Sequence, residues 1–278
     1  MHTITEEQLR MFSRQMEAEE KSALTREKYL RDTRRFAQWL AGRPLTRENL
    51  LTYKQMLSQD YALTSANSMI AAVNAFLRFL QREELVIRQF RLQKTIWCSE
   101  ARELTRADYQ KLVSAARIAG KERLALVIQT VCVTGIRISE LPFLTVEAAR
   151  RGETSVRCKG KQRSVFLVPA LRKELLAYAK RQGIRSGMLF VTRRGRPLDR
   201  SNIWREMKLL CLQAGVNPEK VFPHNLRHLF ARTFYAMDRD IVKLADILGH
   251  SSINTTRIYT VSTGSEHRRK MEQMRLLV

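Results

Sequence analysis

The last third of the sequence concentrates side chains that could act on a phosphate ester without a metal. His250 lies in a Leu-Gly-His-Ser-Ser segment, and Tyr259 follows nine residues later. Upstream, His224 and Arg227 share a Pro-His-Asn-Leu-Arg-His segment, and Arg137 follows a Thr-Gly-Ile segment. Guanidinium groups neutralise phosphate oxygens, imidazoles donate hydrogen bonds or move protons, and a phenol can act as a nucleophile. These residue types together indicate metal-free attack on a phosphodiester.

The charge of the chain indicates a polyanionic partner. Its 278 residues include 50 Lys and Arg against 27 Asp and Glu, a net charge of +23. Residues 99–278 hold 34 of the basic and 16 of the acidic side chains, and residues 151–200 alone hold 14 basic and 3 acidic ones. A solvated basic surface is the simpler alternative. An excess of this size beside candidate phosphate-binding residues favours nucleic acid.

Composition also narrows the cellular setting. The 44% hydrophobic content supports a core, and the four cysteines are scattered without a C-x-x-C pair, which argues against a disulfide framework or a zinc ribbon. The first residues lack the order of a signal peptide, and the apolar stretch at residues 124–133 is too short to span a bilayer. We therefore expect a soluble cytoplasmic protein without a membrane segment, associated with the nucleoid if its source is bacterial.

The N-terminal part predicts a compact domain of four short helices. Apolar residues recur at helical spacing after Thr5, Thr25, Thr46 and Thr64, and each of these threonines stands where a helix can be capped. Residues 86–103 are basic and lack periodicity, which is typical of a linker. The predicted domains are thus a helical domain at residues 1–85, a linker at 86–103, and a second domain at 104–278 that ends in a C-terminal tail.

The second domain is predicted to be mostly helical with one small antiparallel sheet. Residues 154–158 and 164–168 read as two strands of a hairpin with a basic tip. Helices are expected from residue 105, over 124–133, 171–181, 201–214 and 223–237, from 240 to 249, and from 252. The expected fold class is two-domain and mainly α, an all-α domain followed by a mixed α/β domain.

These segments resemble the signature of the tyrosine recombinase, or phage integrase, family of site-specific DNA recombinases. The signature reads Arg, Lys, His-x-x-Arg, His or Trp, and Tyr in this order. Matching residues stand at Arg137, Lys159, His224, Arg227, His250 and Tyr259. A single match would be weak, but six residue types in order and in their local contexts are specific. The likeness covers most of the chain, with a core-binding domain followed by a catalytic domain from about residue 100.

The resemblance implies a role for each matching residue. Tyr259 would attack the scissile phosphate and form a 3′-phosphotyrosine, which stores the bond energy for rejoining. A phenol is protonated at neutral pH, so the site must help to remove its proton. Arg137 and Arg227 would clamp the phosphate and stabilise the pentacoordinate transition state. His224 and His250 would hydrogen-bond the phosphate and assist proton movement.

The signature lysine and two residues near the arginines are assigned as well. Lys159, at the hairpin tip, is the expected general acid for the 5′-oxygen leaving group, although Lys161 could reach the same groove. Glu140, three residues after Arg137, is expected to orient that arginine. His228 follows Arg227 directly and is expected on a different face, as a packed structural histidine.

The resemblance also implies the partners. We expect double-stranded DNA held in a C-shaped clamp, a monomer in free solution, a homotetramer on two DNA sites, and possible accessory proteins. Strand exchange would pass through a Holliday junction. The basic tail at 261–278 would dock on a neighbouring subunit or remain a free surface tail. The first predicted helix starts close to Met1, which leaves little room for an arm-binding domain and favours a recombinase of the chromosome-dimer, integron or mobile-element kind.

Two other functions stay open at this point. A type IB topoisomerase uses similar chemistry on one strand, although the compact helical N-terminal domain favours a recombinase. A DNA-binding relative that has lost cleavage would keep the fold, and the intact signature argues against it. A metal-dependent nuclease or transposase is less attractive, because no H-E-x-x-H or paired-cysteine motif is present and acidic residues are sparse among the basic ones.

The expected mechanism uses neither a metal nor ATP, and this can be tested directly. Strand cleavage in excess EDTA should proceed at the same rate as in buffer with Mg²⁺, because arginines and a lysine supply the charge and the proton that a metal would otherwise provide. A gel assay of covalent protein–DNA product measures it. Loss of cleavage on chelation, with recovery on adding Mg²⁺, would contradict the metal-free mechanism.

Overall fold

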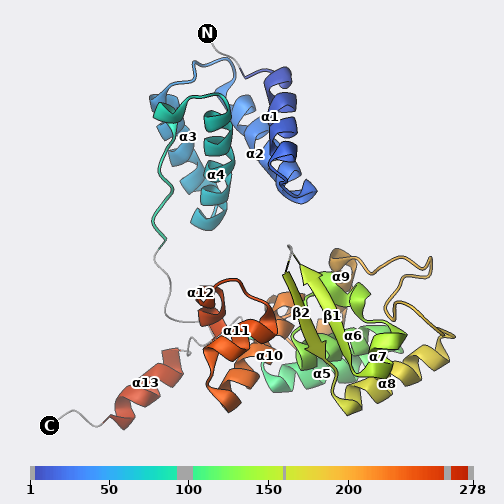
Figure 1. Ribbon diagram of the computed structural model, residues 1–278. Helices are drawn as coiled ribbons and strands as arrows, with labels where there is room; N and C mark the ends of the chain where they lie inside the picture. Colours follow the sequence, from blue (N-terminus) through green and yellow to red (C-terminus); the bar gives the residue numbers. More distant parts are fainter. Residues whose placement is uncertain (1–3, 93–102, 159–160, 260–263, 275–278) are drawn as a thin grey trace. The chain divides into compact units, whose positions relative to one another are not determined.

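The computed structural model describes residues 4–92, 103–158, 161–259 and 264–274 (Figure 1). The chain forms two compact units, Met1–Lys94 and Thr95–Val278, each with its own buried core. The first is helical, and the second combines helices with one two-stranded antiparallel sheet. The predicted fold class is therefore confirmed.

Four helices build the first unit. They are α1 (Glu6–Ala18), α2 (Ala23–Leu40), α3 (Arg47–Asp60) and α4 (Leu63–Phe79), followed by the 3₁₀ turn η1 (Glu83–Leu85). Thr5 and Thr46 cap α1 and α3 as predicted. The other two starts differ from the prediction, because Ser22 caps α2 and α4 begins after Ala62 without a side-chain cap. A polar residue near a helix start does not by itself fix which peptide group it caps.

Two asparagines of α4 bind the chain that follows this helix. The buried Asn74 donates to the carbonyl of Ile87 at 2.8 Å and accepts from its N–H at 3.1 Å. Asn67, two helical turns earlier, makes the same pair of bonds with Phe90, at 2.9 and 2.7 Å. Ile87 is 2% exposed. The first residues of the segment predicted as a linker are thus packed along α4 like an unpaired strand.

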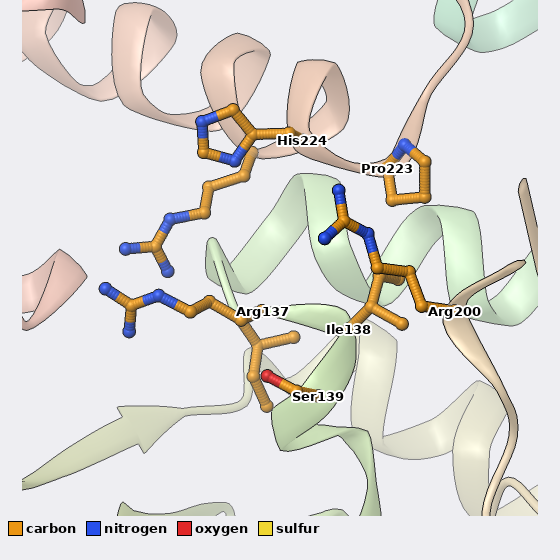
Figure 2. A pocket seen from close by; sticks show the side chains of 8 residues that line it. Arg137, Ile138, Ser139, Arg200, Pro223 and His224 are labelled. Atoms are coloured by element: carbon orange, nitrogen blue, oxygen red, sulfur yellow. The ribbon is translucent and has the colours of Figure 1, made fainter. Parts of the chain in front are cut away.

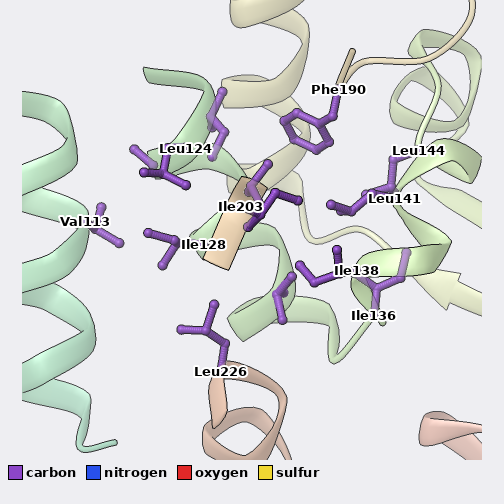
Figure 3. Close-up of a cluster of buried hydrophobic side chains, with 14 of the residues drawn as sticks. Val113, Leu124, Ile128, Ile136, Ile138, Leu141, Leu144, Phe190, Ile203 and Leu226 are labelled. Carbon is purple, nitrogen blue, oxygen red and sulfur yellow. The ribbon is translucent and has the colours of Figure 1, made fainter. Parts of the chain in front are cut away.

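The second unit is organised around α6. Its elements are α5 (Arg106–Ile118), α6 (Glu122–Thr134), η3 (Ile138–Phe143), α7 (Val146–Arg151), β1 (Glu153–Cys158), β2 (Lys161–Phe166), α8 (Pro169–Arg181), α9 (Arg200–Ala214), η4 (Pro218–Lys220), α10 (Pro223–Asp238), α11 (Ile241–Leu248), α12 (Ile253–Thr256), η5 (Arg257–Tyr259) and α13 (Gly264–Gln273). Helices α5, α8, α9 and α10 all contact α6, whose apolar residues are buried on most sides, as expected from the sequence. Figure 3 shows Ile128 of α6 close to Ile203 of α9 and Leu226 of α10 in this core.

The hairpin is longer than the sequence pattern predicts. Strands β1 and β2 pair from Glu153 with Phe166 to Cys158 with Lys161. Gln162 and Arg163 therefore lie in β2 and not in the tip. Alternation sets their sides: Val165 is 4% exposed, whereas Phe166 is 72% exposed. Arg163 stands two residues before Val165, so its side chain is on the inward face of the hairpin. The hairpin lies beside α7 (Figure 1).

Removal of the Asn74 clamp should destabilise the helical unit. In Asn74→Leu the N–H and carbonyl of Ile87 stay buried without partners, which should cost about 2 kcal/mol. Hydrogen exchange of the Ile87 amide measures this as faster exchange. Gln55→Leu, an exposed change on α3, is the matched control and should change stability by less than about 0.5 kcal/mol. Unchanged protection of Ile87 in Asn74→Leu would contradict the clamp.

Candidate active site

Arg227 is the most deeply buried of the predicted site residues. Its side chain starts in the second turn of α10 and is 1% exposed. The guanidinium donates to the carbonyl of Gly135, to that of Leu248 at 2.6 Å, and to Nε2 of His250 at 3.1 Å. Both carbonyls belong to helix C-termini, where the partial negative charge of the helix dipole stabilises a cation. Among the described residues, no carboxylate forms an ion pair with this guanidinium.

Glycines in the left-handed conformation make these two helix ends possible. Gly135 caps α6 with φ +65°, and Gly249 caps α11 with φ +63°. A Cβ at Gly135 would lie 2.5 Å from the Phe230 ring, and one at Gly249 would lie 2.5 Å from Cδ of Arg163. Each glycine is needed for its backbone angle and for the close approach of a neighbouring side chain.

Arg137 begins the short helix that follows α6 and shares its charge with a buried carboxylate. Its Nη1 donates to Oε1 of Glu140 at 2.9 Å, and its backbone N–H donates to Oε2 at 2.9 Å. Its Nη2 reaches the carbonyl of Gly249 at 3.4 Å. Glu140 is 2% exposed and also accepts a bond from Nη2 of Arg163 at 2.7 Å. Glu140 therefore contacts Arg137 as predicted, and the structure adds a second arginine to the pair.

The hydrogen bonds of His250 define its protonation state. A guanidinium can only donate, so Nε2, which faces Arg227, must be the acceptor. The proton is then on Nδ1, which donates to Oγ1 of the buried Thr256 at 2.8 Å. Desolvation, followed by the charges of Arg227 and Arg137, lowers the pKa of His250 to about 4. The ring is neutral at physiological pH.

Four aromatic rings form a continuous row next to Arg227. His224 contacts His228 edge to face at 4.7 Å, and His228 contacts Tyr259 in the same way at 4.5 Å. The ring of His250 also stacks on Tyr259, at 5.7 Å between ring centres. Tyr259 is 2% exposed. His228 is packed, as the sequence suggested, and the structure adds that its ring packs against Tyr259.

The buried environment lowers the pKa of the imidazoles and of Arg227. Desolvation, then His224 and Arg227, lower the pKa of His228 to about 4, and desolvation with nearby arginines also lowers the pKa of His224. Burial, more than the nearby Arg137 charge, lowers the pKa of Arg227 to about 10, which leaves it protonated at neutral pH.

Two pockets meet at Arg137. One is bounded by His224, Arg227 and Arg200, and Figure 2 shows the side chains of Arg137, Arg200 and His224 around it. The other, on the hairpin side, is bounded by Glu140, Arg163, Asp246 and His250. Arg137 thus lines both openings, whereas Arg227 lines only the first. A guanidinium that faces an open pocket can bind a phosphate oxygen.

The structure brings together five of the six predicted signature residues. Arg137, His224, Arg227, His250 and Tyr259 meet in one region, whereas Lys159 lies outside the described residues, as does the side chain of Lys161.

The sequence patterns did not identify Arg163 and Arg200 as site residues. Arg163 belonged to the predicted basic tip, and only an extension of the alternation at residues 164–168 back to residue 163 would have placed it on the inward face. Arg200 carried no comparable signal.

The described residues contain neither a membrane-spanning helix nor a cluster of metal ligands. No helix among them is long and apolar enough to cross a membrane. No group of three or more His, Cys, Asp and Glu side chains is placed there to hold a metal ion.

Comparison with known proteins identifies the family. Residues 102–266 match the phage integrase family, and residues 9–84 match the phage integrase N-terminal SAM-like domain. The chain therefore belongs to the phage integrase family of tyrosine recombinases, as its signature indicated.

Its similarity to individual members extends over nearly the whole chain. Tyrosine recombinase XerA of Pyrococcus furiosus is 30% identical over 284 residues, which cover 99% of this chain and 96% of the relative. The XerH site-specific recombinase bound to its difH substrate has a TM-score of 0.71 at 19% identity, covering 96% and 84% of the two chains. A lambda integrase tetramer bound to a Holliday junction has a TM-score of 0.72 at 19% identity, covering 91% and 76%.

The depressed pKa of His228 predicts how stability depends on pH. In the unfolded chain His228 has a pKa near 6.5, whereas in the folded chain its pKa is about 4. Between these two pH values the unfolded chain therefore binds a proton that the folded chain does not. The free energy of unfolding contributed by this group is therefore fully present above pH 6.5 and falls as the pH is lowered toward 4. His228→Phe keeps an aromatic ring and should flatten this decline. Urea midpoints between pH 7 and pH 5 measure it, and parallel curves for the two proteins would contradict the assignment.

Proposed function

We propose that this chain is a site-specific DNA recombinase that cuts and rejoins duplex DNA through a 3′-phosphotyrosine on Tyr259. The observation that carries the proposal is a chain of contacts. Arg227 and Arg137 both donate to carbonyls at the end of α11, and His250, which accepts from Arg227, stacks on Tyr259. A phosphate held by the two guanidiniums would therefore lie beside the nucleophile.

The charge balance of the site suits a phosphodiester. Arg227 is paired with neutral acceptors, so its positive charge is available to the non-bridging oxygens. Arg137 and Arg163 together contribute two positive charges against the single negative charge of Glu140. The site therefore has a net positive charge. It stabilises the transition state more than the ground state, because negative charge builds up on the oxygens of the pentacoordinate phosphorus.

The reaction that these groups support has two reversible steps. In the first, the oxygen of Tyr259 bonds to phosphorus, the bond to the 5′-oxygen breaks, and Lys159 gives that oxygen a proton. In the second, a 5′-hydroxyl from the partner duplex attacks the phosphotyrosine and returns the phenol. Neutral His224 is the proposed acceptor of the phenol proton. His250 is less suited to that step, because its Nε2 accepts from Arg227 and a pKa of about 4 makes its ring a weak base.

The burial of Tyr259 suggests that DNA binding completes the site. A side chain that is 2% exposed offers little access to an incoming phosphate. We propose that the segment Arg257–Tyr259 moves when DNA binds and presents the phenol to the phosphate between Arg137 and Arg227. Cleavage would then be restricted to assembled complexes.

The proposed partner is double-stranded DNA, and the proposed active assembly is a homotetramer on two sites. XerH is bound to its difH substrate and lambda integrase is a tetramer on a Holliday junction, and these relatives share the fold of this chain. The proposal extends their arrangement to this protein, without a metal or ATP. The net charge of +23 supports it.

Replacement of the nucleophile tests the proposal. Protein expressed in a bacterium and recovered under strong denaturant should carry covalently attached DNA, and sequencing that DNA should reveal the preferred site. Tyr259→Phe removes one oxygen and should abolish the attachment, a loss of about a thousandfold or more, while leaving DNA binding intact. Attached DNA that persists in Tyr259→Phe would assign the nucleophile elsewhere. Binding without attachment in either protein would favour a relative that has lost cleavage.

A further inference from the structure

Arg163 of β2 touches the same carboxylate as Arg137, from the opposite side. Its Nη2 lies 2.7 Å from Oε2 of Glu140, and its side chain is 11% exposed. Glu140 itself is 2% exposed, so solvent screens neither contact well. One buried carboxylate thus serves two arginines that come from different elements of the second unit.

The position of Arg163 is fixed by the surrounding backbone. Val165 anchors the inward face of β2 in the core, and Arg163 stands on that face, opposite the buried Val156 of β1. Its aliphatic stem lies against Gly249, where any Cβ would approach Cδ to 2.5 Å. Gly249 also provides the carbonyl that Arg137 reaches at 3.4 Å. Arg137 of the turn after α6, Arg163 of β2 and the C-terminus of α11 therefore meet at Gly249.

We propose that Arg163 is a positioning residue that keeps Glu140 from neutralising Arg137. The inference rests on the proposed function, in which Arg137 binds the scissile phosphate. With Arg163 present, the group of Arg137, Glu140 and Arg163 has a net charge of +1. Without it, the carboxylate is left to Arg137 alone, the net charge falls to zero, and Arg137 loses much of its attraction for a phosphate.

This account differs from a simple structural tether in one measurable way. If Arg163 only anchored the hairpin, removal of Glu140 as well would do further harm. If Arg163 offsets the Glu140 charge, then Glu140→Gln in the Arg163→Gln background restores a net charge of +1 and should recover activity. The double variant therefore separates the two roles by the sign of the interaction.

The experiment measures single-turnover formation of the covalent complex on a nicked duplex that carries the site recovered with the attached DNA, at saturating protein. Arg163→Gln should react roughly tenfold more slowly than wild type, and the double variant should react faster than Arg163→Gln. Arg163→Lys keeps the charge and should restore most of the rate. Arg157→Gln removes a charge from an exposed position of the same hairpin and should stay within about twofold of wild type. Thermal unfolding checks that each variant is folded.

The outcomes separate this inference from the proposed function. Wild-type rates in Arg163→Gln, or a double variant no faster than Arg163→Gln, would overturn the role of Arg163 while leaving the recombinase proposal intact. A wild-type protein that forms no covalent complex would overturn the proposed function. In that case the affinity of each variant for a fluorescein-labelled duplex tests Arg163. Arg163→Gln should bind more weakly than Arg157→Gln, the double variant should recover affinity, and equal affinities would overturn the inference.

Discussion

A buried guanidinium that has no carboxylate partner among the described residues is the constraint on which the rest of the second unit depends. Arg227 is stabilised by carbonyl groups of Gly135 and Leu248, at the C-termini of α6 and α11. A buried charge needs such partners, and removing one of them would leave an N–H of the guanidinium without an acceptor in the interior. The helices must therefore end where they do, and the structure keeps a positive charge at the proposed phosphate-binding position.

The second guanidinium is held by a different device. Arg137 shares a carboxylate with Arg163, and the three side chains connect the turn after α6, the hairpin and the end of α11 through Glu140 and Gly249. One arginine is thus oriented by helix dipoles and the other by a charge network. Mutations around the two arginines should therefore have different effects. The loss of a carbonyl partner of Arg227 cannot be compensated by neutralising a second residue, whereas a charge imbalance around Arg137 can be.

Much of the fold and of the signature could be predicted from the sequence, because local patterns carry both. Helical periodicity predicts a buried α6, and Thr5 and Thr46 cap the predicted starts. The signature also identified the family. The hairpin register was less predictable, since a basic stretch at residues 161–163 resembles a loop and becomes a strand only when it pairs with β1. The packing of Ile87 and Phe90 on α4 could not be predicted either, because the asparagines that bind their backbone are 13 and 23 residues away in the sequence.

The sequence by itself determined which residue types were available for phosphate chemistry, and tertiary structure decided which of them meet. His228 illustrates the difference: its neighbour Arg227 was recognised, yet only the packing of η5 against α10 places its ring on Tyr259. The neutral state of His250, the burial of Tyr259 and the pairing of Arg163 with Glu140 have the same origin. Each depends on atoms brought together from distant segments, and burial then sets the charge that each group carries.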